Sequence, residues 1–132
     1  MTGLDTNVLV RYIVQDDPKQ ARLATRYIET QCTSDSPGRV NLIVLCELTW
    51  VLTRGYSYDR QTVVSVLRRM LTSPELSVEE DEAVWQALKL YEQGYAGFAD
   101  YLIGVLNHRS GASPTVTFDL KAAKESLFKL LA

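Results

Sequence analysis

Apolar residues in this chain follow two different spacings. Short apolar or β-branched runs predict strands at residues 2–4, 40–42, 75–78 and 114–119. Between these runs, apolar residues recur every three or four positions, which is the spacing of helices with one buried face. The predicted helices cover residues 8–15, 18–31, 43–54, 58–71, 79–94 and 97–111, and residues 120–131 form a final helix or a helix plus a short strand.

Several residues predict where these helices begin, end and face. Asp17 is the expected N-cap of the second helix, Pro18 its first residue, and Gly55 the C′ residue of the third. Helical spacing also predicts which side chains of three helices face inward. They are Ala21, Ala24, Tyr27 and Ile28; Val44, Leu48, Val51 and Leu52; and Val63, Val66, Leu67 and Met70.

The order of the predicted elements indicates an α/β protein. Strands that alternate with helices form parallel sheets with helices on both faces. We therefore expect a three-layer α/β/α fold around a central parallel sheet of four or five strands. The 132 residues are the size of one domain, so residues 1–132 are expected to form a single unit.

The composition of the chain indicates its class of protein and its cellular location. The chain is 46% hydrophobic and 23% charged, which suits a globular core rather than a disordered segment. No apolar run is long enough to span a membrane, and Arg11 follows the first apolar stretch instead of preceding it as in a signal peptide. We expect a cytoplasmic protein. Cys32 and Cys46 lack the spacing of a metal site, and Cys46 is interpreted as a small core residue.

The net charge of −2 is not that of a basic nucleic-acid-binding protein. It comes from 14 lysines and arginines against 16 aspartates and glutamates. If four of the acids were gathered at one metal site, the remaining surface would carry a small excess of positive charge. A polyanionic substrate therefore remains compatible with the composition.

Two aspartates stand at the ends of predicted strands. Asp5 follows the first strand, and Asp119 closes the strand at 114–119. The carboxyl ends of parallel strands share one edge of a sheet, which is where α/β proteins place their functional groups. Each residue also has a simpler interpretation, because Asp is among the preferred N-caps of helices.

Glu47 and Asp100 are the other two candidates. Glu47 has apolar neighbours one turn away on both sides, which predicts a buried carboxylate that needs a cation or a strong donor. Its alternative role is a buried ion pair with Arg11 or Arg54. Asp100 lies in the first turn of a helix that begins near Phe98, where the helix dipole favours an anion and an Asp can act as a cap.

Four acids from four segments at one edge would repel one another without cations. Mg²⁺ or Mn²⁺ meets this need, because hard cations prefer oxygen ligands and share the phosphates of a substrate. One or two such ions can activate a water for hydrolysis of a phosphodiester bond.

Four stretches of the chain resemble the PIN-domain ribonucleases, specifically the VapC toxins of bacterial toxin–antitoxin pairs. They are "LDTNVLVRY", "VNLIVLCELTWVL", "FADYLI" and "TFDLKAAK", and they follow the order of that family from Leu4 to Lys124. The resemblance implies a Mg²⁺- or Mn²⁺-dependent endoribonuclease that hydrolyses RNA with a metal-activated water. It also implies a VapB-type antitoxin as partner and, commonly, a homodimer.

The resemblance places the acidic quartet of the family on Asp5, Glu47, Asp100 and Asp119. The first three hold the metal, and Asp119 either supports them or acts through a water. Thr6 and Asn7 match polar residues that support the first aspartate. In one departure, Leu120 stands where many relatives carry a basic residue, although Lys121 and Lys124 remain.

Other residues have weaker claims to function. Arg11, Arg54 and Arg109 are candidate phosphate contacts, and His108 is interpreted as a surface residue near a helix end. Two rival functions stay open. The first is a phosphotransfer hydrolase with Asp5 as nucleophile, which lacks the second aspartate expected at position 7. The second is a non-catalytic α/β interaction module whose acids only cap helices, which leaves the predicted burial of Glu47 unexplained.

Overall fold

The computed structural model describes residues 1–132. They form two compact units, an N-terminal unit (Met1–Glu79) and a C-terminal unit (Glu80–Ala132). None of the helices has the length and apolar character needed to cross a membrane. The chain is a helix-rich α/β protein whose paired strands are all parallel, as the alternation of elements predicts.

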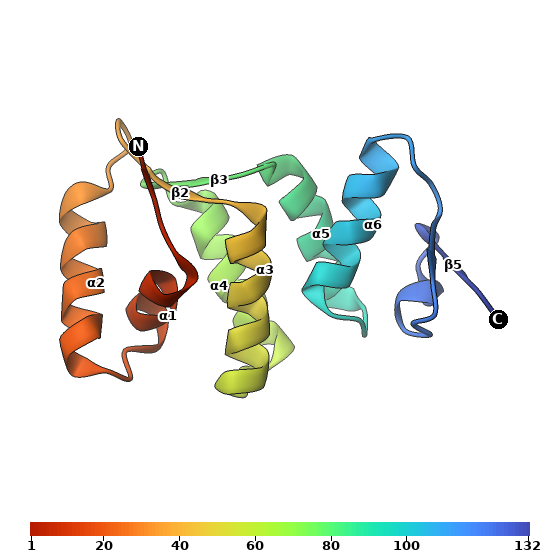
Figure 1. Ribbon diagram of the computed structural model, residues 1–132, viewed down its shortest axis with the longest axis horizontal. Helices are drawn as coiled ribbons and strands as arrows, with labels where there is room; N and C mark the ends of the chain where they lie inside the picture. Colours follow the sequence, from red (N-terminus) through yellow and green to blue (C-terminus); the bar gives the residue numbers. More distant parts are fainter. The chain divides into compact units, whose positions relative to one another are not determined.

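The N-terminal unit contains a three-stranded parallel sheet in the order β1-β2-β3, with β2 in the centre. Its helices follow the strands along the chain, and α1 packs against both α2 and α3 (Figure 1). The elements are β1 (Thr2–Gly3), α1 (Thr6–Val14), α2 (Pro18–Gln31), β2 (Gly38–Val40), α3 (Leu42–Trp50) with a π-helical turn (Val51–Gly55), α4 (Arg60–Thr72) and β3 (Leu76–Val78).

The C-terminal unit is a helical hairpin followed by a two-stranded parallel sheet. The ring of Phe128 lies so close to Gly104 that a Cβ there would come within 2.5 Å of it, so the glycine allows the last strand to pack on α6. The elements are α5 (Asp81–Gln93), α6 (Phe98–Arg109), β4 (Thr115–Thr117), a 3-10 turn (Ala122–Lys124) and β5 (Phe128–Leu130). The second of the two predictions for residues 120–131, helix plus strand, is thus confirmed.

The helix boundaries follow from side-chain caps. Asp17 accepts a hydrogen bond from the backbone N–H of Gln20, with Pro18 next in the chain, as predicted. Asn41 caps α3 by accepting from Val44 N–H, so β2 ends at Val40 and not at residue 42. Glu79, which the pattern assigned to the start of the following helix, instead accepts from Leu42 N–H at 2.9 Å.

Three predicted details of burial and helix ends are wrong. Tyr27 is 39% exposed, and the buried side of α2 consists of Ala21, Ala24 and Ile28. On α4, Val64 is buried and Val66 is only half-buried. Gly55 does not end its helix in the left-handed conformation; the chain continues through the π-helical turn, and Ser57 has the positive φ of 57°.

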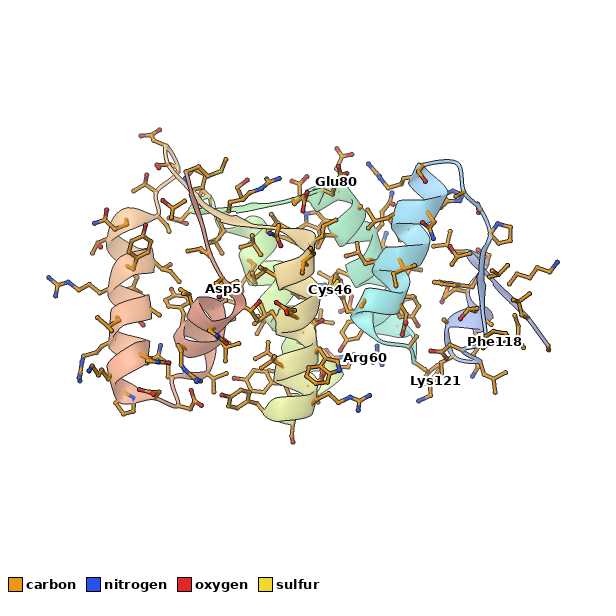
Figure 2. All side chains as sticks on the ribbon, in the orientation of Figure 1. Asp5, Cys46, Arg60, Glu80, Phe118 and Lys121 are labelled. Carbon is orange, nitrogen blue, oxygen red and sulfur yellow. The ribbon has the colours of Figure 1, made fainter.

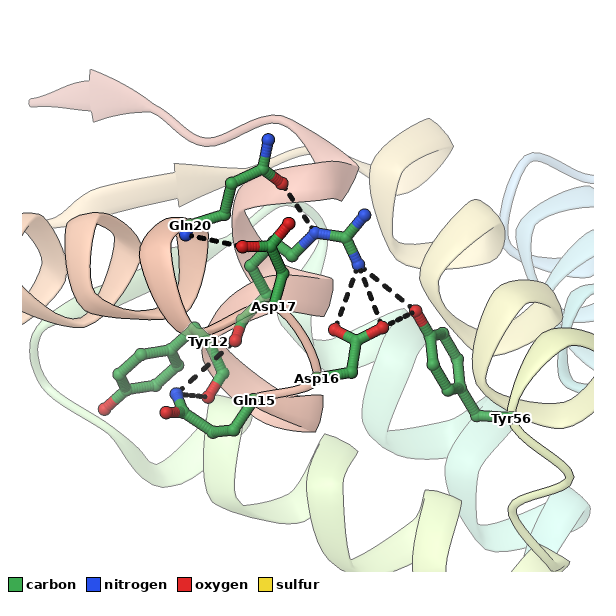
Figure 3. Close-up of polar contacts among 7 residues, drawn as sticks. Tyr12, Gln15, Asp16, Asp17, Gln20 and Tyr56 are labelled. Atoms are coloured by element: carbon green, nitrogen blue, oxygen red, sulfur yellow. Dashed lines mark hydrogen bonds and ion pairs between the residues drawn. The ribbon is translucent and has the colours of Figure 1, made fainter.

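A polar network ties the C-terminal part of α1 to the segment after α3 (Figure 3). Arg11 donates to both carboxylate oxygens of Asp16, at 3.1 and 3.3 Å, and to the Tyr56 hydroxyl at 3.2 Å. That hydroxyl donates in turn to Asp16 at 2.6 Å. The hydrogen bond from Tyr56, together with the charge of Arg11, lowers the pKa of Asp16.

This network predicts a pH-dependent contribution to stability. A carboxyl whose pKa is lowered by folding stabilises the protein above its unfolded pKa of about 3.9 and loses that effect as pH falls through the lower folded value. Tyr56→Phe removes the main cause of the shift. We expect the variant to be less stable than the parent at neutral pH, with the difference shrinking as pH falls through this range. Urea unfolding at several pH values measures it; a difference independent of pH would contradict the assignment.

Candidate active site

Asp5 and Glu47 lie in the N-terminal unit and are linked through Thr6. Asp5 is the N-cap of α1, and its Oδ1 accepts from the backbone N–H of Thr6 at 2.8 Å. The buried Thr6 donates its hydroxyl to Oε1 of Glu47 at 2.7 Å. Figure 2 shows Asp5 where the chain enters α1 after the first strand. The start of α1 is therefore joined to the middle of α3 by one hydrogen bond.

Glu47 is exposed, which overturns the prediction that its apolar neighbours bury it. Ile43 and Trp50, one turn away on either side, are 73% and 63% exposed. The helix packs instead through its other side, so these neighbours form a solvent-facing strip. The alternative ion pair with Arg11 is also wrong, because Arg11 binds Asp16. Glu47 is held by Thr6. Because Glu47 is exposed, it no longer argues against the interpretation of the protein as a non-catalytic interaction module.

Asp100 and Asp119 lie in the C-terminal unit. Asp100 is half-buried in the first turn of α6, and its Oδ2 accepts from the N–H of the N-cap residue Gly97 at 3.1 Å. Asp119 is exposed after β4, and its Oδ1 accepts from Lys121 N–H at 2.8 Å and more weakly from Ala122 N–H at 3.4 Å. Both aspartates thus stabilise the start of a helical turn.

The hydroxyl of Tyr101, the residue after Asp100, makes two hydrogen bonds that the sequence pattern did not indicate. It accepts from the backbone N–H groups of Tyr95 and Ala96, both at 3.1 Å, while the ring is buried. Together with the bond from Gly97 to Asp100, three successive amides of the loop before α6 are held by two adjacent side chains. Its only signal in the sequence is an aromatic residue on the buried stripe of α6.

The capping interpretation is thus confirmed for Asp5 and Asp100, and Asp119 accepts from two amides of the turn that follows it, but each aspartate uses only one oxygen for these contacts. The second oxygens of these aspartates, and Oε2 of Glu47, accept no hydrogen bond in the structure. The four carboxylates can therefore offer oxygen ligands without giving up their structural contacts. This donor set fits Mg²⁺ or Mn²⁺. Each unit contains two of the four, and neither unit by itself groups three metal-binding side chains.

The other predicted residues differ in their surroundings. The exposed Asn7 makes no side-chain hydrogen bond and borders a mainly apolar cavity of about 530 Å³ together with Val8 and Leu23. Arg11 is engaged by Asp16, and Arg109 lies 3.5 Å from Glu82. His108 is an exposed residue in the last turn of α6, as predicted, and its Nδ1 lies 3.1 Å from the Ser113 hydroxyl.

Both cysteines are free thiols, and burial raises the pKa of each thiol. Cys46 is only half-buried, so its assignment as a core residue is only partly correct, whereas Cys32 is buried.

Comparison with known proteins confirms the resemblance seen in the four sequence stretches. The model of the PIN domain family matches residues 4–124 and so includes all four carboxylates. A VapC ribonuclease from Aquifex aeolicus (strain VF5) is 26% identical over 124 residues, which cover 94% of this chain and 91% of that protein. No solved structure matches the chain. The family match covers nearly the whole sequence, and the chain belongs to the PIN domain family.

Proposed function

We propose that this protein is a metal-dependent endoribonuclease and the toxin of a type II toxin–antitoxin pair. The observation that carries the proposal is the PIN domain match over residues 4–124. The similarity to a protein named VapC ribonuclease supports the choice of RNA as substrate. The free carboxylate oxygens supply the ligands that such chemistry requires.

In this proposal Asp5, Glu47 and Asp100 hold one or two Mg²⁺ or Mn²⁺ ions, and Asp119 supports them directly or through a water. When bound, the cation supplies Lewis acidity that activates a water and offsets the charge of the phosphate. Thr6 keeps the carboxylate of Glu47 in one orientation through its 2.7 Å hydrogen bond. The amides of Thr6, Gly97 and Lys121 fix the three aspartates in the same way.

The proposal requires the carboxylates of the two units to meet at one site. It therefore includes a three-layer α/β/α domain over residues 1–132 with a central parallel sheet of four or five strands. In such a sheet the carboxyl ends of β1 and β4, next to Asp5 and Asp119, lie on the same edge. A VapB-type antitoxin as inhibitor and a homodimeric state complete the proposal.

The products of RNA cleavage test this function. Attack of water on the phosphorus, with the 3′ oxygen leaving, yields 5′-phosphate and 3′-hydroxyl ends and does not need the 2′-hydroxyl. We expect such ends from purified protein with Mg²⁺ or Mn²⁺ and no cleavage with EDTA. Cyclic 2′,3′-phosphate ends, or cleavage that persists in EDTA, would contradict the mechanism.

The interaction module remains the second candidate because three of the four acids do cap helical turns. It predicts that the protein binds no divalent cation and cuts no RNA. Isothermal titration of Mn²⁺ into the protein separates the two candidates. Binding that is lost when Asp5 or Asp100 is changed to Asn favours the nuclease.

A further inference from the structure

Exposed aromatic and basic side chains gather around Asp119 in the C-terminal unit. We define them as the aromatic–basic patch: Tyr95, Phe118, Leu120, Lys121 and Lys124. Phe118 is 80% exposed, Leu120 is 70% exposed and Tyr95 is 67% exposed. Figure 2 shows Phe118 and Lys121 on the segment that follows β4. Exposure of large apolar side chains to water costs free energy, and a group of them on one surface indicates a binding site.

Two segments of the patch meet where Lys124 contacts Tyr95. The ammonium group of Lys124, at the end of the 3-10 turn, lies 5.0 Å from the centroid of the Tyr95 ring, which belongs to the loop before α6. Phe118 and Leu120 flank Asp119 directly in the chain. The loop before α6 also leads into Asp100. Two of the carboxylates proposed to act in catalysis therefore adjoin the patch.

The charges of the patch favour a polyanion. Lys121 and Lys124 are both exposed, and neither forms an ion pair with a carboxylate of the chain. Surfaces that bind single-stranded nucleic acid combine such cations with exposed rings on which bases stack. Bases inside a duplex already stack on one another and do not offer their faces to a protein ring.

We propose that single-stranded RNA binds the aromatic–basic patch, with bases stacked on Phe118 and Tyr95 and phosphates next to Lys121 and Lys124. The inference rests on the proposed nuclease function, since it explains how a phosphodiester is brought to Asp119 and Asp100. It assigns selection of unpaired RNA to these rings and not to the metal site. Phe118 and Tyr95 are specificity residues in this assignment.

RNA binding without cleavage tests the proposal. The probe is a fluorescein-labelled single-stranded oligoribonucleotide of mixed sequence, added to the full chain in EDTA and followed by fluorescence anisotropy. Phe118→Leu and Tyr95→Leu keep an apolar side chain but remove the ring, and each is expected to raise the Kd about tenfold. Tyr27→Leu, which removes a ring that is 39% exposed on α2, is the matched control and leaves the Kd unchanged.

Two further measurements locate the RNA on the wild-type protein. Light-induced crosslinking of an RNA that carries 5-iodouridine is expected to attach to peptides containing Phe118 or Tyr95. Lys121→Gln and Lys124→Gln are each expected to reduce the slope of log K against log salt by about 0.7. A duplex of the same sequence is expected to compete poorly.

The outcomes separate this inference from the proposed function. Normal RNA binding by both Leu variants, or crosslinks only to other segments, overturns the stacking assignment while leaving metal-dependent cleavage in place. RNA bound at the patch without any cleavage in Mg²⁺ overturns the nuclease assignment instead. If the Leu variants bind RNA normally but escape inhibition by an antitoxin, the patch is a protein-binding surface and the inference is wrong.

Discussion

Replacement of Asp5 by Asn is expected to abolish RNA cleavage while leaving the fold intact. Substitutions of residues that only orient metal ligands already cost about 10- to 100-fold in activity or metal affinity. Loss of a proposed ligand is therefore expected to cost at least about a hundredfold. Asn is as good an N-cap as Asp, and its side-chain oxygen can still accept from Thr6 N–H. The loss should appear in the cleavage rate and in Mn²⁺ binding, and not in the melting temperature.

The matched control is Asp59→Asn. Asp59 caps α4 by accepting from the N–H and the hydroxyl of Thr62, at 2.8 and 2.6 Å, so it has the same local role without belonging to the proposed site. We expect this variant to cleave RNA at the parental rate. Equal activity of the two variants would show that Asp5 is only a cap and would favour the interaction module.

Thr6→Val is expected to slow cleavage about 10- to 100-fold, the usual effect of removing a hydrogen bond that orients a metal ligand. Val has nearly the shape of Thr, so the buried position stays filled while the donor to Glu47 is lost. The exposed Glu47 can turn to water, so its carboxylate is no longer held in one orientation. We expect the Mg²⁺ concentration for half-maximal activity to rise together with the fall in kcat.

Two companion variants distinguish orientation from packing. Thr6→Ser restores the hydroxyl and should recover most of the activity. Thr49→Val removes another buried hydroxyl, one that donates to the backbone oxygen of Cys46 on the same helix as Glu47, and should not change the Mg²⁺ dependence. If Thr49→Val matched Thr6→Val in activity and Mg²⁺ response, the effect would come from packing on α3.

Local chemistry explains what could be predicted from the sequence. The cap at Asp17, the proline after it and the short strand ending at Val78 all depend on neighbouring residues, and all are found in the structure. The same holds for the caps at Asp5 and Asp100, whose hydrogen bonds span no more than three residues. The family resemblance likewise rests on four short stretches of sequence, two of which contain Asp5 and Asp100.

Contacts between distant segments explain what could not be predicted. The spacing on α3 and its π-helical turn correctly predicted that Val44, Leu48 and Leu52 are buried. Apolar residues also occupy the exposed side of this helix, so the apolar neighbours of Glu47 wrongly placed it inside. Thr6 and Glu47 are 41 residues apart, and only the packing of α1 against α3 brings them to 2.7 Å.

The two carboxylate oxygens of each capping aspartate have different roles, which bears on how a protein with the proposed nuclease function changes in evolution. One oxygen keeps the helix in place and the other remains free for a cation. An Asp codon becomes an Asn codon by a single G-to-A transition. Under the proposed function, such a single nucleotide change at Asp5 or Asp100 would remove a metal ligand while the helix cap is kept, so catalysis would be lost in one step without loss of the fold.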